Sequence, residues 1–203
     1  MEFVFQIAVL IMSVVIHEVS HGYAASALGD QTARWEGRLT LNPFKHLDPI
    51  GSFVVPAIAY MTAGFIFGWA RPVPYNPYNL RPGRWSEAIV AAAGPLSNIA
   101  LALIFGFLLR SGITLGFASE AFIQITAVVV LINIVLAVFN LIPIAPLDGS
   151  KILFALFPEN AVSFRNFFER YGLILILFFI FFLWQYLFPI INLIFRVITG
   201  IAF

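Results

Sequence analysis

The sequence predicts an all-α polytopic membrane protein, with about five to six membrane-embedded helical segments and a small membrane-associated β element. Of the 203 residues, 61% are hydrophobic and only 10% are charged, whereas soluble domains average about 45–50% apolar and about 25% charged residues. Several apolar stretches reach the length of about 20 residues that a helix needs to cross a bilayer. The formal net charge is +1, which gives no electrostatic reason to expect a nucleic-acid partner. These observations exclude a soluble monomer, a disordered chain and a nucleic-acid-binding module, and predict one domain over 1–203.

The first apolar stretch, residues 3–28, is interrupted only near its end by two His and a Glu. The small residues at 24–27 resemble the cleavage site of a signal peptide, which is the alternative interpretation. No Lys or Arg precedes the apolar run, and a discarded peptide has no need of buried His and Glu residues. A retained membrane helix is therefore the better interpretation.

The next part of the chain is less regular. Segment 31–41 places Thr, Trp and Leu between polar residues, a pattern that favours a short strand or hairpin. Residues 50–68 are apolar, but three Gly and one Pro interrupt them, so a straight spanning helix is not assured. The connection 69–86 contains four Pro residues, which exclude a regular helix and favour short extended structure at Val73 and Tyr75.

Three further stretches have the composition of spanning helices. Residues 87–109 and 121–142 are apolar with a few Asn residues, and residues 171–188 are dense in Phe, Leu and Ile and end at Pro189. The tail 190–203 is apolar but short, and we expect it to form an interfacial or lipid-facing extension.

Residues 17–21 read HEVSH and match the pattern HExxH. His17 and His21 are four residues apart, so on a helix both imidazoles lie on one face and can reach one metal ion, with Glu18 beside them as a base for water. Because a charged residue at mid-membrane costs about 3 kcal/mol or more, such a group needs a chemical reason. The alternative to a metal site is a polar contact between this helix and a neighbouring one.

A catalytic zinc site needs a third protein ligand. The chain has no Cys, so the third ligand is His46 or a carboxylate. Asp148 stands out among the acids, because it follows an apolar helix that Pro143 and Pro146 break, which allows a carboxylate to project inward. Gly149 permits a close backbone approach beside it.

Three motifs together resemble a known family. HEVSH, the central AAAGPLSN and NLIPIAPLDG are similar to the signatures of the site-2 protease family of intramembrane zinc metalloproteases. LNPFKHLDPIG and GWARPVPYNP resemble its small branch, which lacks PDZ or CBS modules. The matched segments are residues 17–21, 91–98, 140–149, 41–51 and 68–77.

This resemblance implies one Zn²⁺ per chain, held by His17, His21 and Asp148, with Glu18 as the general base. Asn140 corresponds to a family position that contacts the substrate or the scissile carbonyl. Asn98 is a second candidate for substrate or oxyanion binding. A hydrogen bond from Asn98 to a neighbouring helix or to a metal ligand is an equal alternative, and for the other central amide, Asn133, a structural hydrogen bond between helices is the better interpretation.

The resemblance further implies a protease that hydrolyses peptide bonds in or near transmembrane segments of membrane-tethered regulatory proteins, as in regulated intramembrane proteolysis. The expected partners are such a substrate and the lipid bilayer, and nothing indicates an oligomeric state. Segments 31–41 and 68–77 could supply an edge strand that pairs with an extended substrate. A metal transporter and a non-catalytic scaffold are the rival functions. The first predicts ligands spread along a pathway, and the second predicts a degenerate HExxH; neither is seen.

The basic residues predict the orientation in a bacterial or archaeal cell membrane. Arg and Lys concentrate on the cytoplasmic side, and connections 29–49, 69–86 and 143–170 hold nine of the eleven. We therefore expect the N-terminus outside and the active site towards the cytoplasm. Residues 50–68 would then have to be re-entrant or interfacial, because both of their ends lie on the same side.

Overall fold

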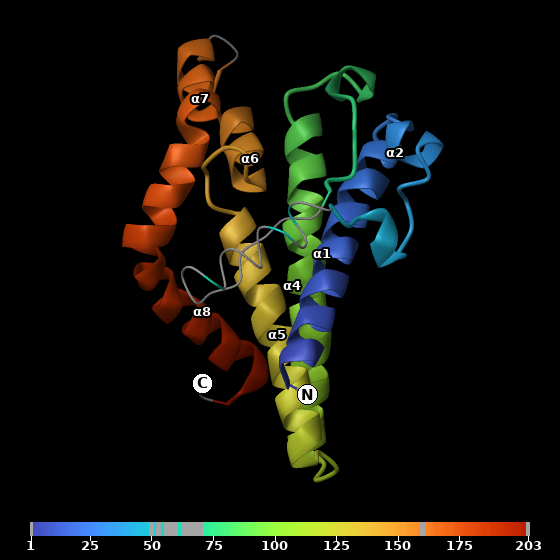
Figure 1. Ribbon diagram of the computed structural model, residues 1–203, viewed down its shortest axis with the longest axis vertical. Coiled ribbons are helices and arrows are strands. Elements are labelled where there is room, and N and C mark those ends of the chain that lie inside the picture. The colour runs from blue at the N-terminus through green and yellow to red at the C-terminus, as the bar shows by residue number, and fades with distance from the viewer. Residues whose placement is uncertain are drawn as a thin grey trace.

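The computed structural model describes residues 2–48, 51, 54, 61, 71–158 and 161–201. Within these residues the regular elements are helices, which confirms the predicted all-α class (Figure 1). The expectation for residues 50–68 falls almost wholly outside the described residues. The longer elements are α1 (Glu2–Ala27), α4 (Ser86–Thr114), α5 (Glu120–Asn140), α6 (Asp148–Leu156), α7 (Val162–Phe178) and α8 (Trp184–Thr199). The short ones are α2 (Thr32–Trp35), the 3₁₀ turns η1 (Pro43–Lys45) and η3 (Pro77–Asn79), and the π-helical turn η4 (Phe179–Leu183).

Four helical runs among the described residues are long and apolar enough to cross a membrane. They are Val4–Ala27, Ser86–Thr114, Glu120–Asn140 and Val162–Thr199. The first three correspond closely to the stretches predicted from the sequence. The fourth joins α7, η4 and α8 into one continuous run that changes direction near η4 (Figure 1).

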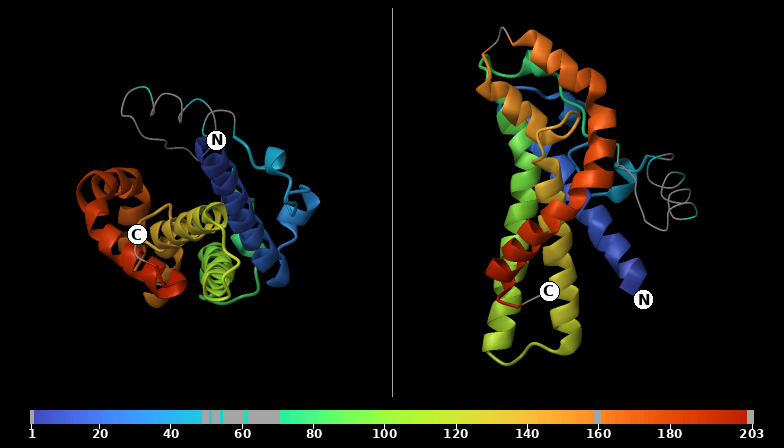
Figure 2. Two further views of the ribbon diagram at one scale, coloured as in Figure 1. Left: turned by 90° about the horizontal axis from the view of Figure 1, so that it is seen from below. Right: turned by 90° about the vertical axis from the view of Figure 1, so that its left-hand side faces the viewer.

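Helix α4 is the centre of the bundle. It packs against α1, α5, α6 and α8, and α1 crosses α4 and α5 at an incline (Figure 2). The largest buried apolar cluster lies between α4, α5 and α8, at Ala102, Val130, Ile134, Ile191 and Phe195. This packing fixes α4, α5 and α8 relative to one another.

The C-terminal run differs from the sequence expectation. Residues 190–199 are not a separate extension, because the helix continues through Pro189 to Thr199. Phe195 is only 1% exposed, and Gly106 of α4 lets Ile198 approach so closely that an added Cβ would overlap it. The π-turn before α8 and the burial of this face against α4 and α5 accommodate the proline. One face of the tail is thus part of the core, whereas Ile190, Leu193 and Val197 on its other face are exposed.

The predicted β element is absent from the described part of the chain. Residues 32–35 form the single turn α2, because Asp30 Oδ1 accepts hydrogen bonds from both the N–H (3.2 Å) and the hydroxyl (2.6 Å) of Thr32. Segment 71–76 is drawn out and forms no helix (Figure 1), and none of the described residues pairs with it as a strand. A side chain joins the two segments instead of a backbone ladder: Arg38 Nη2 donates to the carbonyls of Arg71 (2.8 Å) and Pro72 (3.2 Å).

Asp30 fastens the far end of the extended segment to the end of α1. Its carboxylate is fully buried and accepts hydrogen bonds from the Asn76 N–H (2.8 Å) and from Asn79 Nδ2 (3.0 Å). Burial raises the pKa of Asp30, but the hydrogen bonds from Thr32, Asn76 and Asn79 outweigh it and hold the pKa below its ordinary value. The carboxylate therefore stays charged at neutral pH and keeps segment 71–76 beside α1.

Candidate active site

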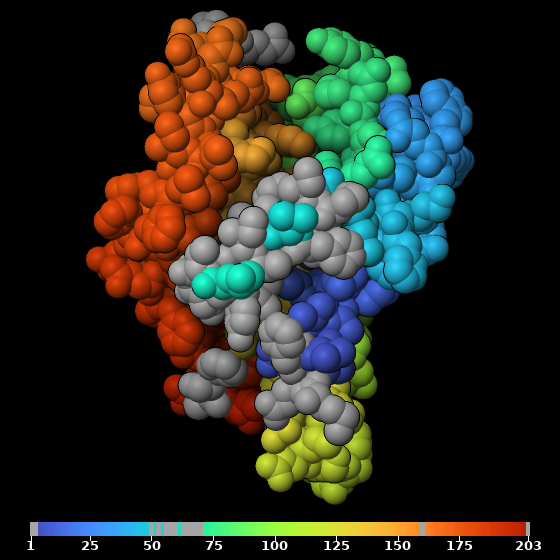
Figure 3. Space-filling model, in the orientation of Figure 1, coloured from blue at the N-terminus to red at the C-terminus, as the bar shows by residue number. Residues whose placement is uncertain are grey.

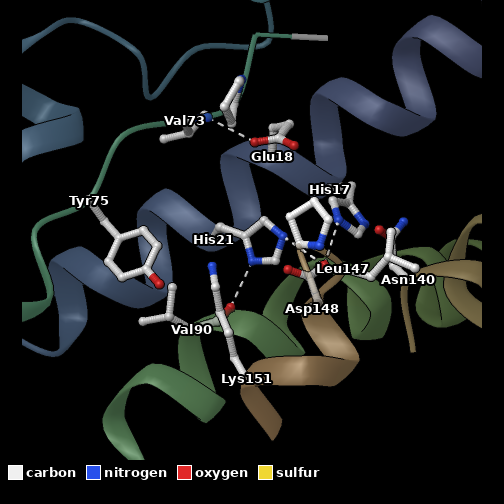
Figure 4. A pocket seen from close by; sticks show the side chains of 12 residues that line it. His17, Glu18, His21, Val73, Tyr75, Val90, Asn140, Leu147, Asp148 and Lys151 are labelled. Carbon is white, nitrogen blue, oxygen red and sulfur yellow. Dashed lines mark hydrogen bonds and ion pairs between the residues drawn. The ribbon is translucent and has the colours of Figure 1, made fainter. Parts of the chain in front are cut away.

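The two histidines of the HExxH motif lie one turn apart on the face of α1 that meets α4. Their ring centroids are 4.7 Å apart, and their exposed fractions are 5% for His17 and 9% for His21. The i, i+4 spacing predicted this shared face. Figure 4 shows both rings directed towards the start of α6.

Asp148, the first residue of α6, completes the group. Its Oδ2 lies 3.1 Å from Nε2 of His17 and 3.3 Å from Nε2 of His21. Gly149 makes this placement possible, because a Cβ there would overlap the carbonyl groups of Leu141 and Ile142 at the end of α5. The broken helix predicted from the prolines therefore turns the carboxylate inward, onto the two imidazoles.

The group fits a metal ion. One ligand atom from each of His17, His21 and Asp148 lies within 4.8 Å of the others, and all three residues are buried. Tetrahedral zinc with bonds of about 2.0–2.1 Å places its ligand atoms about 3.3 Å apart, close to the two distances given above. Gly94 of α4 leaves the space, since a Cβ there would overlap Nε2 of both histidines. Two nitrogens and one oxygen are donors that suit zinc.

Hydrogen bonds fix which ring nitrogen of each histidine carries the proton. His21 Nδ1 lies 2.7 Å from the carbonyl of Val90, and His17 Nδ1 lies 2.6 Å from Oδ1 of Asn98. Both oxygens only accept hydrogen bonds, so Nδ1 is the donor in each ring. With Nδ1 as the donor, Nε2 is the nitrogen that a neutral imidazole offers to a metal ion, and in both rings it lies next to Oδ2 of Asp148.

Glu18 points away from the histidine rings, towards the extended segment. Its Oε2 accepts a hydrogen bond from the backbone N–H of Val73 at 2.8 Å (Figure 4). Glu18 lines the same cavity of about 180 Å³ as both histidines, Asp148 and Asn140. The base predicted from the motif is thus placed beside the candidate metal group and held by a neutral donor.

The remaining sequence candidates fall in different places. Asn140 lines the cavity, and its Nδ2 donates to the carbonyl of Leu136 at 3.0 Å. Asn98 is fully buried behind His17, away from the cavity lining. His46 lies elsewhere, with Nε2 donating to the carbonyl of Thr40 at 2.8 Å, and it is not in the ligand group.

The structure adds residues that sequence reasoning missed. Val73 acts through its backbone N–H, which no side-chain motif reveals. Lys151, one turn after Asp148, lines the cavity, and its Nζ lies 4.9 Å from the centroid of the Tyr75 ring. The spacing from Asp148 would have indicated Lys151, because residues i and i+3 share a helix face.

Lys151 also borders a second cavity, of about 410 Å³, between the start of α4, α6 and α7. The corresponding face is hollowed between α7 and the green segment that precedes α4 (Figure 3). The candidate metal group therefore lies near a hollowed end of the bundle rather than at its middle.

Similarity to known proteins agrees with this geometry. The sequence pattern of peptidase family M50 matches residues 5–115 and 113–184. A protein of Bacillus subtilis strain 168 that is named as a zinc metalloprotease, YwhC, is 40% identical over 173 residues, covering 83% of this chain and 76% of that protein. Rip2 of Mycolicibacterium smegmatis, also named as a zinc metalloprotease, is 32% identical over 72% of this chain and 55% of its own length. Rip2 of Mycobacterium tuberculosis is 30% identical over 74% of this chain and 56% of its own length.

No solved structure matches the chain significantly. The family match covers most of the residues, and it includes both the HExxH helix and the segment with Asp148. With a His-His-Asp group placed to hold the metal ion, the protein belongs to peptidase family M50, the site-2 proteases, and is a zinc metalloprotease with membrane-spanning helices.

Proposed function

We propose that His17, His21 and Asp148 hold one Zn²⁺ and that Glu18 is the general base of an intramembrane endopeptidase. The observation that carries this proposal is the convergence of three ligand atoms from α1 and α6 within 4.8 Å, in a buried position beside a Glu. Bound zinc supplies a Lewis acid that activates water and polarises a peptide carbonyl.

The residues of the chain have distinct tasks in this proposal. Glu18 takes a proton from the attacking water and returns it to the leaving amine. The Val73 N–H donates to the Glu18 carboxylate and fixes its position. Asn140 has a second amide hydrogen beyond the one given to Leu136, and this hydrogen is available to a substrate carbonyl at the cavity.

Asn98 has a different task from the substrate or oxyanion binding that the sequence suggested. Its side chain is 0% exposed, and its Oδ1 accepts the His17 Nδ1–H at 2.6 Å. We therefore assign it to orienting a metal ligand, which was the alternative left open by its mid-helix position.

We propose that the substrate is a single transmembrane segment of a membrane-tethered regulatory protein. The two histidines of the metal group lie on α1, within a run long and apolar enough to cross the membrane, and Pro72, Val73 and Tyr75 of segment 71–76 border the cavity. A substrate must be locally extended for its peptide bond to be attacked, and an extended neighbour can pair with it by main-chain hydrogen bonds.

Metal removal tests the function directly. The purified protein in lipid vesicles, mixed with a single-span substrate, is expected to cleave it. Dialysis against a strong chelator is expected to abolish cleavage, and added Zn²⁺ is expected to restore it; product formation on a gel measures both steps. The same sequence offered as a water-soluble peptide is the comparison for membrane specificity. Substrate retained without cleavage would favour a scaffold, and zinc accumulation inside the vesicles would favour a transporter.

We also propose that the metal group faces the cytoplasm. Nine of the eleven basic residues lie in the stretches 29–49, 69–86 and 143–170, and the other two are Arg110 and Arg196. Figure 1 shows α2, α6 and the start of α4 at one end of the bundle, the end that a cytoplasmic excess of basic residues would assign to the cytoplasm. The chain has no Cys, so single cysteines report sidedness without background. In intact cells a membrane-impermeant thiol reagent is expected to label Phe117→Cys and to leave Arg84→Cys unlabelled; the reverse pattern would invert the orientation.

A further inference from the structure

We infer that Asn133 of α5, together with Ser13 of α1, is a positioning residue for zinc binding that acts on His17 through Asn98. This inference rests on the proposed function, since it assumes that His17 is a metal ligand. Its basis is a chain of hydrogen bonds that runs from α5 through α4 to His17, among side chains that are at most 5% exposed. No sequence motif includes Ser13 or Asn133.

The orientation of the Asn98 amide decides which proton His17 carries. Asn98 Nδ2 donates to the carbonyl of Ser13 at 3.3 Å and to Oδ1 of Asn133 at 2.8 Å. The Ser13 carbonyl only accepts hydrogen bonds, so the amide nitrogen must face it. The amide oxygen is thereby turned towards His17, which must then donate from Nδ1.

The Asn133 amide is oriented by the same logic. Its Nδ2 donates to the carbonyl of Val129 at 2.9 Å and to the hydroxyl oxygen of Ser13 at 3.0 Å. The Val129 carbonyl is again a pure acceptor, so Oδ1 of Asn133 faces Asn98 and completes that amide's hydrogen bonds. The backbone carbonyls of Ser13 on α1 and Val129 on α5 thus set the direction of every hydrogen bond in this series.

The consequence is a histidine prepared to bind metal before the ion arrives. With Nδ1 donating to Asn98, Nε2 of His17 is the nitrogen that faces Asp148, 3.1 Å away, where the ion would bind. Without Asn133, the Asn98 amide keeps only the longer bond to the Ser13 carbonyl and can turn its NH₂ towards His17. The His17 Nδ1–H then loses its acceptor, and the ring is no longer held with Nε2 towards Asp148.

Zinc affinity is the quantity that separates this role from simple packing. We compare wild type, Asn133→Leu and the matched control Thr126→Val. Thr126 lies on the same helix and is 3% exposed, and among the described residues its hydroxyl donates to the carbonyl of Phe122, within its own helix. Competition with a chromogenic chelator in detergent is expected to show a 10–100-fold loss of Zn²⁺ affinity for Asn133→Leu, as for other residues that orient metal ligands, and wild-type affinity for Thr126→Val.

The outcomes are distinguishable. If Asn133→Leu lowers the melting temperature of the metal-free protein but binds Zn²⁺ like the control, the residue is only structural and the inference fails. If wild type itself binds no Zn²⁺, the proposed function fails instead. Should Asn133→Leu not fold, Ser13→Ala takes its place, because it removes one acceptor of the chain and leaves both amides. Its affinity is then expected to fall by up to about tenfold, and an unchanged value would overturn the inference.

Discussion

Replacing Glu18 with Gln is expected to lower peptide hydrolysis by about 10²–10⁴-fold, the usual contribution of a general acid–base group, while Zn²⁺ stays bound. Gln is nearly isosteric, and its side-chain oxygen can still accept the Val73 N–H that holds Glu18 at 2.8 Å. What it lacks is the ability to take a proton from water at neutral pH. The ligand group of His17, His21 and Asp148 is untouched, so zinc content is expected to match wild type.

Cleavage of a single-span substrate and zinc content per chain are measured on the same preparation. Glu36→Gln is the matched control, because Glu36 is exposed and is not part of the cavity lining. Wild-type cleavage by the Glu18→Gln variant would remove Glu18 from the mechanism. Loss of zinc from this variant would show instead that Glu18 supports the metal group, and the loss of rate would then say nothing about proton transfer.

Replacing Gly94 with Ala is expected to remove zinc and activity together. The new Cβ would overlap Nε2 of both His17 and His21, the two atoms that must face the ion. Overpacking of a tight site costs about 1–3 kcal/mol, and each ~1.4 kcal/mol is a factor of ten. We therefore expect Zn²⁺ affinity to fall by about 100-fold, measured by chelator competition, with cleavage falling in parallel at limiting zinc.

Gly112→Ala in the same helix is the control for adding a methyl group to α4. There the added Cβ meets Phe122, Phe117 and Ala118 at 3.0–3.2 Å, and 18 residues at about 1.5 Å each put it about 27 Å from Gly94. Its zinc affinity is expected to equal that of wild type. Unchanged zinc affinity in Gly94→Ala would mean that the histidines move aside readily, and that the close approach of α4 is not needed for the site.

The candidate metal group could be predicted from the sequence because each of its clues lies within a short stretch of the chain. The spacing of His17 and His21 fixes a shared helix face, and the prolines before Asp148 end a helix where a carboxylate is needed. Two other features of the site depend on tertiary packing instead. The Val73 N–H reaches Glu18 only because segment 71–76 is fastened by side chains, and Asn98 could be assigned to His17 only after α1 and α4 were placed side by side.

In the fold, too, some elements follow from single segments and others depend on tertiary packing. Helices α1, α4 and α5 follow from length and hydropathy, which are properties of single segments. The prediction of a β element was wrong within the described residues, because the hydrogen bonds that Asp30 accepts and Arg38 donates compete with strand pairing there. The tail 190–199 was misjudged because Pro189 indicates an end to the helix, whereas burial of Phe195 against α4 and α5 continues it.

The hydrogen bonds of α1 also bear on the order in which the protein assembles. The partners of His17 are distant in sequence, since Asn98 follows it by 81 residues and Asp148 follows it by 131 residues. Domains and their helices emerge from the ribosome N-terminus first, so α1 is made while these partners do not yet exist. Polar side chains at membrane depth cost several kcal/mol until they are paired. During synthesis α1 is therefore an unstable membrane helix that α4, α5 and α6 stabilise as they arrive, and a chain stopped before residue 148 would contain the motif without the site.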